Sequence, residues 1–315
     1  MIERPARAYS RCVPVIATNE LTKRYPGVTA LDRLTVDIEP GVTGLVGANG
    51  AGKSTLIKIL LGLTDSTSGK SSVLGFDTSA DGLTLRGRVG YMPEHDCLPG
   101  DLSATEFVVH MARMSGLPAD AARERTADTL RHVGLFEERY RPIGGYSTGM
   151  KQRVKLAQAL VHDPDLVLLD EPTNGLDPVG REDMLTLIRR IHSDFGISVL
   201  VTSHLLGELE QICDHVIIID GGVLLRSSSI GEFTRSGSQL AIEVTPDTDA
   251  VDAAMAGAGL QVQRDRHLLV VEAEGDATYD LVRDVVVQLG VGLVRLEPRR
   301  HRIAEVFEGG VADAS

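Results

Sequence analysis

The stretch that decides the fold is V-T-G-L-V-G-A-N-G-A-G-K-S-T-L-I-K-I-L-L-G-L, residues 42–63. It reads as a short apolar strand, a glycine loop and a helix. Gly47 to Ser54 has the G-x-x-x-x-G-K-S spacing of a phosphate-binding loop. Glycines without a Cβ let successive backbone N–H groups turn toward one anion, and a helix starting near Gly52 adds its positive end. We expect Lys53 to reach the outer phosphates of a nucleotide and Ser54 to place its hydroxyl on Mg²⁺.

The alternative interpretation of this stretch is a glycine-rich turn that holds a lysine by chance, because the chain has 33 glycines. The flanking residues favour the phosphate-binding loop. An apolar strand ends before the loop, and apolar residues recur at helical spacing after it. These are Leu45 and Val46 before the loop and Leu56, Ile59, Leu60 and Leu63 after it.

Composition limits the functions that the chain can have. Its length of 315 residues predicts one large or two ordinary domains, and 43% hydrophobic residues suffice for a buried core. The net charge is −12 without a basic run, so general nucleic-acid binding is not expected. Cys12, Cys97 and Cys213 are scattered, which indicates neither a disulfide framework nor a metal site.

The ends of the chain and its apolar runs give no sign of a membrane span. Residues 1–12 read as a flexible leader, and the apolar stretch that follows is too short for a signal-peptide core. No run of 18 or more apolar residues occurs, so a role at a membrane is expected to require a partner.

Residues 13–236 read as one α/β unit. Leu31 to Ile38 alternates apolar and polar residues, which predicts an antiparallel strand. A helical part covers about residues 98–162, with a capping box that begins at Ser103. The apolar run 166–169 ends at Asp170, and the apolar run 197–202 is followed by His204. Both runs predict buried parallel strands, and residues 205–213 read as a helix.

Alternating strands and helices predict a doubly wound parallel sheet. Sites in such sheets lie at the carboxyl ends of the strands. We therefore expect Gly47, Asp170 and His204 to lie together although they are far apart in the sequence.

A second unit is expected at residues 237–315. Residues 239–245, 260–264, 267–273 and 291–297 read as strands, and 249–256 and 276–289 as helices. The order βαββαβ predicts a small two-layer α+β domain. It has no recognisable catalytic constellation, and a ligand sensor or a dimerisation unit are both possible roles for it.

Further motifs resemble those of the ATP-binding-cassette (ABC) ATPases, in the order and spacing of that family. The resemblance covers roughly residues 13–236 and implies a P-loop NTPase cassette with an antiparallel β subdomain and a helical subdomain. The motifs are Y-S-T-G-M-K-Q (146–152, the signature), L-V-L-L-D-E-P (166–172, Walker B), N-G-L-D (174–177, the D-loop), T-S-H (202–204, the switch) and Y-M-P-E (91–94, the Q-loop).

The resemblance implies a role for each matching residue. The nucleotide would be bound by Gly47, Asn49, Gly50, Ala51, Gly52, Lys53, Ser54 and Thr55. Asp170 would hold Mg²⁺ through water, and Glu171 would be the general base for the attacking water. His204 would contact the γ-phosphate and orient Glu171, and Tyr25 would stack on adenine. Each residue also has a purely structural interpretation. These are a strand-end cap for Asp170, a surface acid for Glu171, an ordinary histidine for His204 and a turn aromatic for Tyr25.

Glu94 departs from the commonest family pattern, in which glutamine stands at this position. A carboxylate is a harder, charged ligand for Mg²⁺ and only accepts hydrogen bonds when ionised. We therefore place Glu94 with Ser54 and Asp170 among the Mg²⁺ ligands, where its charge would weaken a nearby interaction with a phosphate oxygen.

The signature residues are expected to serve a second molecule. Ser147 would cap the third helix of the helical part and present an anion site. In the family, the signature of one subunit closes over ATP held by the other. This implies that Ser147, Thr148, Gly149 and Met150 contact ATP in trans, and Asp177 is assigned to the D-loop.

The resemblance implies the ATP-binding and hydrolysing subunit of an ABC transporter of the exporter (ABC-2-like) branch. The signature variant S-T-G-M-K-Q-R and the segment Leu296–Phe307 favour this branch. Expected partners are a second, identical or homologous cassette and integral membrane permease subunits, at the cytoplasmic face of the membrane, with ATP and Mg²⁺ as cofactors. The alternative is a soluble ABC-type ATPase that acts on a nucleic-acid or ribosomal machine.

Overall fold

The structure, a computed structural model, describes residues 14–232, 239–245, 248–265, 268–272 and 276–299. The chain divides into two compact units, one up to Ser228 and one from Ser229. The expected boundary after residue 236 lies in a part outside the described residues, as does the expected leader 1–12. Within the described part, no helix is long and apolar enough to cross a bilayer.

The first unit begins with an antiparallel sheet. Its strands are β1 (Ile16–Tyr25), β2 (Val28–Ile38), β4 (Ser68–Val73) and β5 (Phe76–Asp77), in the order β2-β1-β4-β5. In β2 the apolar side chains Leu34, Val36 and Ile38 are buried and the residues between them are exposed. The alternation predicted from the sequence is therefore confirmed.

A six-stranded sheet forms the centre of the first unit, in the order β10-β9-β3-β8-β7-β6. Its strands are β3 (Val42–Val46), β6 (Val89–Met92), β7 (Leu166–Leu169), β8 (Ser198–Ser203), β9 (His215–Asp220) and β10 (Val223–Ser229). The strands β3, β8 and β7 are adjacent and parallel, so their carboxyl ends lie at one edge. This edge brings together the residues that follow the three strands.

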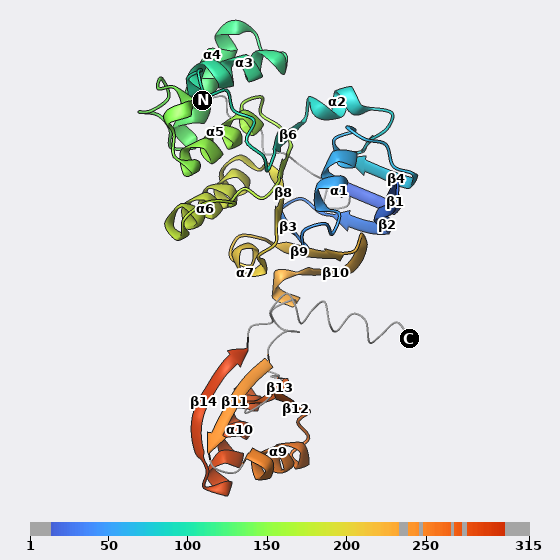
Figure 1. The fold of residues 1–315 in the computed structure, drawn as a ribbon, viewed down its shortest axis with the longest axis vertical. Helices are drawn as coiled ribbons and strands as arrows, with labels where there is room; N and C mark the ends of the chain where they lie inside the picture. Colours follow the sequence, from blue (N-terminus) through green and yellow to red (C-terminus); the bar gives the residue numbers. More distant parts are fainter. Residues whose placement is uncertain (1–13, 233–238, 246–247, 266–267, 273–275, 300–315) are drawn as a thin grey trace. The chain divides into compact units, whose positions relative to one another are not determined.

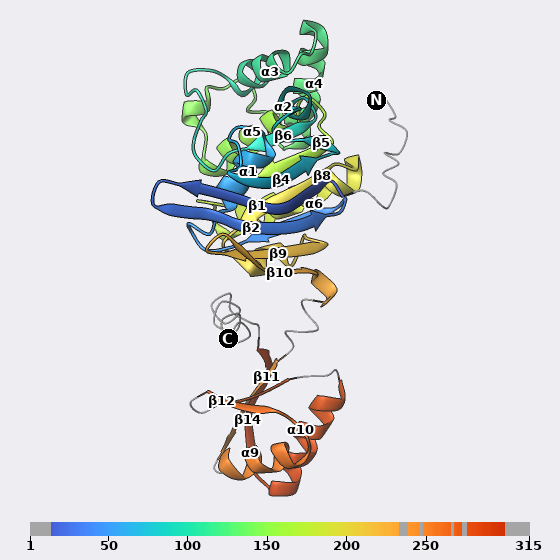
Figure 2. The ribbon, with the colours of Figure 1, turned by 90° about the vertical axis from the view of Figure 1, so that its right-hand side faces the viewer.

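The first unit also contains helices. They are α1 (Lys53–Leu60), α2 (Gly82–Arg86), α3 (Ala104–Met114), α4 (Ala119–His132), α5 (Thr148–Leu160), α6 (Pro178–Phe195) and α7 (Leu206–Leu209). Figure 1 shows α5 and α6 on one side of this sheet and α1, with the antiparallel sheet, on the other. The helices α3 and α4 lie together on the β6 side in both views (Figures 1 and 2).

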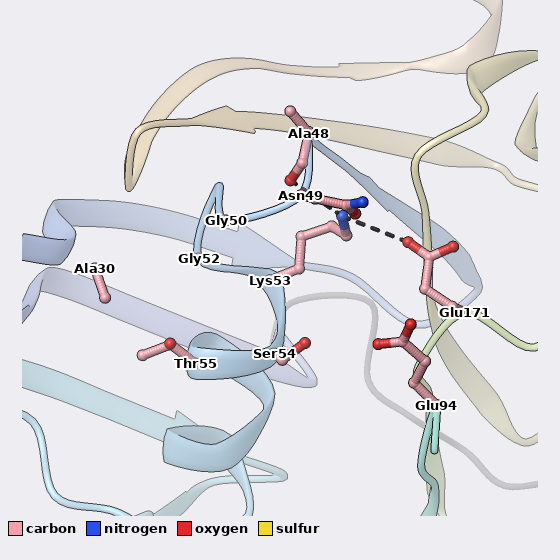
Figure 3. Close-up of a pocket in the computed structure, with 10 residues that line it drawn as sticks. All are labelled: Ala30, Ala48, Asn49, Gly50, Gly52, Lys53, Ser54, Thr55, Glu94 and Glu171. Carbon is pink, nitrogen blue, oxygen red and sulfur yellow. Dashed lines mark hydrogen bonds and ion pairs between the residues drawn. The ribbon is translucent and has the colours of Figure 1, made fainter. Parts of the chain in front are cut away.

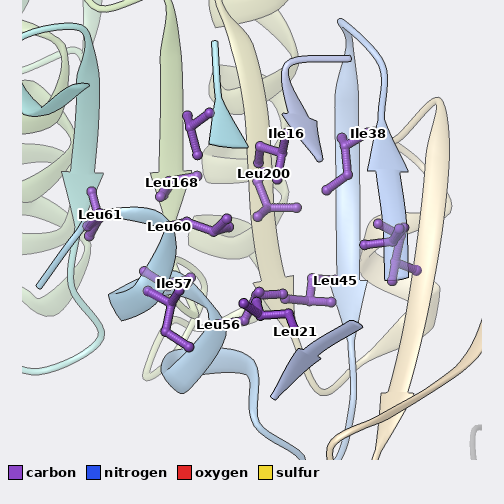
Figure 4. Packing of buried hydrophobic residues seen from close by; sticks show 14 of the residues in the cluster. Ile16, Leu21, Ile38, Leu45, Leu56, Ile57, Leu60, Leu61, Leu168 and Leu200 are labelled. Atoms are coloured by element: carbon purple, nitrogen blue, oxygen red, sulfur yellow. The ribbon is translucent and has the colours of Figure 1, made fainter. Parts of the chain in front are cut away.

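The core of the first unit lies between α1 and the two sheets (Figure 4). Leu56, Ile57 and Leu60 of α1 pack with Leu45 of β3 and Leu200 of β8, and all are buried. Each such side chain contributes about 1.5–3 kcal/mol when it is fully removed from water. This packing fixes the start of α1, and with it the loop that precedes the helix.

Several details differ from the sequence prediction. The helix α1 ends at Leu60, so Leu63 lies beyond it and is 58% exposed. A helix was expected over 205–213, but only Leu206–Leu209 is helical. The segment contains Gly207, which is a weak helix former, and a helix this short depends on tertiary contacts for its stability. The elements α2, β5 and β10 were not predicted.

The second unit has the predicted order of elements. They are β11 (Gln239–Thr245), α9 (Thr248–Gly257), β12 (Val262–Asp265), β13 (Leu268–Glu272), α10 (Asp276–Leu289) and β14 (Gly292–Arg299). The sheet order is β12-β13-β11-β14, with its own core between sheet and helices. The segment Leu296–Phe307 continues beyond the described residues, so its likeness to exporter ATPases stays a prediction.

Candidate functional site: a phosphate-binding pocket

A polar pocket of about 300 Å³ lies beside the loop that follows β3 (Figure 3). In Figure 3 the loop and the first turn of α1 form one side, and Glu94 and Glu171 face them from the other. Most of the predicted nucleotide-binding residues line the pocket. The lining consists of Ala30, Ala48, Asn49, Gly50, Gly52, Lys53, Ser54, Thr55, Glu94 and Glu171.

The loop has its shape because glycine stands where a side chain would collide. At Gly47 an added Cβ would lie 2.6 Å from the Ile219 carbonyl oxygen. Gly52 has φ of 104°, and a Cβ there would lie 2.5 Å from the Ala30 carbonyl oxygen. Gly52 is also the N-cap of α1, so the free N–H groups of this helix face the loop.

Lys53 is buried and bonded within the loop. Its Nζ donates to the carbonyl oxygens of Gly47 at 2.7 Å and Ala48 at 3.3 Å. The same Nζ forms an ion pair with Glu171 Oε1 at 3.4 Å, and both side chains are 7% exposed. The ammonium group is therefore held at the floor of the pocket, next to the carboxylate predicted to be the base.

Asp170 and Glu171 are linked through Thr202 on the neighbouring strand. The Thr202 hydroxyl donates to Asp170 Oδ1 at 2.8 Å and accepts from the Glu171 backbone N–H at 2.9 Å. Burial raises the pKa of Asp170, while hydrogen bonds from Thr202 and Ser54 act in the opposite direction. The Ser54 contact connects Asp170 to the first turn of α1.

Glu171 and His204 contact each other directly. His204 Nδ1 lies 2.9 Å from Glu171 Oε2, and an ionised carboxylate only accepts, so the ring nitrogen donates. Glu171 has φ of 49°, a left-handed conformation that is rare for a non-glycine residue. The structure thus brings together Gly47, Asp170 and His204 through the contacts of Lys53 and Glu171, as the sequence predicted.

Glu94 lines the pocket and is anchored by the signature helix. Its backbone oxygen accepts from Lys155 Nζ at 2.8 Å, and its Oε1 accepts from Asn174 Nδ2 at 3.3 Å. Burial lowers the pKa of Lys155, which lies on α5. The loop that holds Glu94 is therefore tied to both the signature helix and the D-loop.

The signature residues lie outside this pocket. Ser147 is the N-cap of α5, and its hydroxyl oxygen accepts from the Met150 N–H at 3.3 Å. Ser147 and Thr148 are exposed, and Gly149 and Met150 are half-buried. Asp177 caps α6 by accepting from the Gly180 N–H at 2.8 Å. Of the described residues that line the pocket, none belongs to these two motifs.

Tyr25 stands at the end of β1 and is 41% exposed. Lys23 Nζ lies 5.0 Å from the centre of its ring. Among the described residues that line the pocket, Ala30 comes from the following strand β2 but Tyr25 is not included. Its stacking on adenine therefore stays a prediction.

The sequence analysis assigned no individual role to four residues that organise the site: Gln152, Lys155, Thr202 and Glu208. Gln152 Nε2 donates to the Asn174 carbonyl oxygen at 3.1 Å, which ties α5 to the D-loop. Gln152 and Lys155 are buried polar residues three positions apart on one helix, and Thr202 is a polar residue in an apolar strand. For Thr202, this interruption of an apolar pattern was the available signal.

The fold and this pocket define the class of protein. A phosphate-binding loop, a buried Asp–Glu pair at a strand end and a histidine at the next strand end form the site of a P-loop ATPase of the ATP-binding-cassette type.

Comparisons with known proteins identify the family, and residues 31–174 match the ABC transporter family. The bacitracin transport ATP-binding protein BcrA of Bacillus licheniformis is 39% identical over 67% of this chain and 68% of its own. The Nod factor export ATP-binding protein I of Burkholderia pseudomallei is 38% identical over 67% of this chain and 69% of its own. A dimeric bacterial ABC transporter cassette of known structure has a TM-score of 0.62 and 25% identity, over 68% of this chain and 98% of that one.

The chain belongs to the family of ABC transporter ATP-binding proteins. The prediction of an exporter-type ATP-binding and hydrolysing subunit is confirmed, and ATP is its nucleotide. These relatives do not favour the alternative of an ATPase that acts on a nucleic-acid or ribosomal machine.

Proposed function

We propose that this chain is one of two cassettes that bind two ATP molecules between them and drive a separately encoded membrane permease in export. The observation that supports this most is the contrast between two predicted ATP-contacting regions. Lys53, Glu171 and His204 form one connected cluster within the chain. Ser147, at the N-terminus of α5, is exposed and lies outside that cluster's pocket.

Within one chain, the pocket is suited to hold phosphate and activate water. Lys53 places a positive charge beside the loop amides, where the outer phosphates of ATP would lie. Glu171 has its carboxylate at the opposite wall and can accept a proton from water. The hydrogen bond from His204 fixes the orientation of that carboxylate.

The side chains available to Mg²⁺ fit the ion when ATP is present. Ser54, Asp170 and Glu94 supply hydroxyl and carboxylate oxygens, the ligands that Mg²⁺ prefers. Among the described residues, no group of three or more metal-binding His, Cys, Asp or Glu side chains exists. Mg²⁺ is commonly bound by one or two carboxylates together with substrate phosphates, and bound there it would neutralise phosphate charge.

The exposed start of α5 is suited to a nucleotide held by a second cassette. The first N–H groups of a helix attract anions, and Ser147 and Thr148 leave this end open to solvent. Thr148 also lies next to the D-loop, since a Cβ on Gly175 would be 3.4 Å from its methyl group. The dimeric cassette of known structure supports a pair of such chains.

ATP can drive a partner if it binds the closed pair more tightly than the separate cassettes. Hydrolysis removes that preference and reopens the pair. The names of the relatives, bacitracin transport and Nod factor export, support a membrane transporter as the machine that receives this motion.

Glu171→Gln tests this proposal. The variant keeps the shape of the side chain but loses the base, so ATP turnover should fall about 10²- to 10⁴-fold. ATP should still bind, and size-exclusion chromatography with ATP should reveal a trapped dimer. Glu182→Gln, an exposed acid on α6, is the matched control and should behave as wild type. Turnover at the wild-type rate in Glu171→Gln would remove Glu171 as the base.

A further inference from the structure

A second buried carboxylate lies beside the catalytic cluster, and the sequence motifs do not account for it. Glu208 is on α7 and is 8% exposed. Its Oε2 accepts from the Thr173 hydroxyl at 2.8 Å and from the Ser203 hydroxyl at 3.5 Å. Its Oε1 lies 3.1 Å from Arg181 Nε on α6. One side chain thus contacts three separate segments of the first unit.

Each of these segments bears a residue of the predicted catalytic machinery. Thr173 follows Glu171 by two positions, and Ser203 directly precedes His204. Arg181 is on α6, whose N-cap is Asp177. Glu208 therefore joins the segments that place the base, the histidine and the D-loop aspartate.

The backbone at Glu171 needs such support. Its φ of 49° is unfavourable for a non-glycine residue and persists only where surrounding contacts fix it. The turn after it is closed by the Asn174 N–H, which donates to the Glu171 carbonyl oxygen at 3.1 Å. Thr173 lies inside this turn, and its hydrogen bond to Glu208 ties the turn to the segment that contains His204.

The charge of Glu208 also matters. A buried carboxylate is retained at low cost only when it is paired and hydrogen-bonded, and here Arg181 and Thr173 provide both. A glutamine has the same size but offers one accepting oxygen instead of two. In either orientation of the glutamine amide, the negative charge that pairs with Arg181 would be lost, and an NH₂ group facing Thr173 would reverse the direction of that hydrogen bond.

We propose that Glu208 is a positioning residue for ATP hydrolysis, which holds the turn after Glu171 and the strand end before His204 in the register that lets these two residues meet. It acts through Thr173 and Ser203 and does not line the ATP pocket formed by the described residues. This inference rests on the proposed catalytic roles of Glu171 and His204.

Steady-state ATPase kinetics of Glu208→Gln test the inference. A small displacement of a catalytic group costs up to about 100-fold in rate, so kcat should fall about 10- to 100-fold. The KM for ATP should stay within about two-fold of wild type, because the pocket contacts remain. Glu210→Gln, two positions further along, is the matched control and should retain wild-type kcat.

Variants of Thr173 test the same contact from the other side, even if Glu208→Gln does not fold. Thr173→Val removes the hydroxyl and should lower kcat as Glu208→Gln does, whereas Thr173→Ser keeps the hydroxyl and should retain activity. The double variant Glu208→Gln/Thr173→Val should be no slower than the slower single variant, because both remove one interaction.

The inference would be overturned by a wild-type kcat in Glu208→Gln or in Thr173→Val. It would also be overturned if the fold-loss of kcat in the double variant equalled the product of the two single losses. An equal loss in Glu210→Gln or in Thr173→Ser would do the same, since it would indicate a general structural effect. Glu171→Gln in the same assay separates the two proposals. If Glu171→Gln stops turnover while Glu208→Gln does not, only the role of Glu208 fails; if Glu171→Gln turns over normally, the proposed catalytic site itself fails.

Discussion

The pocket at the end of β3 and the N-terminus of α5 are the two regions expected to contact ATP, and they are built in opposite ways. In the pocket, Lys53 and Glu171 are buried and paired, and His204 is bonded to the same carboxylate. At the start of α5, Ser147 and Thr148 are exposed, and the Ser147 hydroxyl caps its own helix by accepting from the Met150 N–H. The difference is the one expected if the first region forms a site within the chain and the second, as we propose, completes a site on a second molecule.

The two regions are nevertheless connected inside the chain. Lys155 and Gln152 of α5 bond to the backbones of Glu94 and Asn174, which belong to the Q-loop and the D-loop. A movement of the signature helix would therefore displace the backbone of the pocket wall at Glu94. A displacement of that wall would in turn move the signature helix. Such a connection is what a cassette needs if ATP binding and the pairing of cassettes are to be coupled.

The largest effect that would break the comparison is expected from Lys53→Ala. The variant removes a charged donor from the phosphate site and leaves Glu171 buried without its cation. Loss of a hydrogen bond to a charged group costs about 1.5–3 kcal/mol, so ATP affinity should fall about 10- to 100-fold, measured by calorimetry. Lys58→Ala, an exposed lysine on the same helix, should leave the affinity unchanged. Wild-type affinity in Lys53→Ala would remove the phosphate-binding assignment.

A smaller effect is expected on protein stability from Asp170→Asn, which measures the free-energy cost of burying a charge at the pocket and so sharpens the contrast with the exposed start of α5. The pKa of Asp170 is raised above its ordinary value of 3.8, chiefly by burial. The folded state therefore binds its proton more tightly than the unfolded state, and the stability from this group falls as pH rises from 3.8 through the raised pKa. Asp170→Asn removes this penalty, which is about 1.4 kcal/mol for each unit of pKa difference.

The Asp170→Asn protein should therefore melt a few degrees higher than wild type at pH 7, and this gain should shrink toward acidic pH. Thermal melts at several pH values measure it. Asp37→Asn, an exposed position on β2, is the matched control and should show no such gain. A lower melting temperature for Asp170→Asn at pH 7 would mean that the hydrogen bonds from Thr202 and Ser54 outweigh burial.

The sequence was informative where local chemistry fixes the structure. The spacing from Gly47 to Ser54 predicted a loop, and only glycine fits beside the Ile219 and Ala30 carbonyl oxygens. The apolar run 166–169 predicted a buried parallel strand, and β7 is buried and pairs in parallel with β8. The capping box at Ser103 predicted the start of α3, because its bonds are local.

The sequence was uninformative where a side chain acts through residues distant in the chain. Glu208 lies in a segment, 205–213, that was predicted only as a helix, and its partner Thr173 is 35 positions away. Lys155 has the spacing of a solvent-facing residue, yet it bonds to a carbonyl oxygen 61 positions away. Such contacts depend on how strands and helices pack, so no local pattern predicts them.

The central claim is that Ser147 completes an ATP site on another molecule, and the most direct test places Ser147→Arg in the Glu171→Gln background. Ser147→Ala in the same background is the stability control, because it removes the same helix cap at a cost of about 1 kcal/mol without adding bulk. Size-exclusion chromatography with ATP, together with ATP titration of the isolated chain, measures both properties. We predict that Ser147→Arg abolishes the ATP-dependent dimer while the single chain still binds ATP with unchanged affinity. A dimer that persists, or a loss of ATP binding by the single chain, would contradict the account.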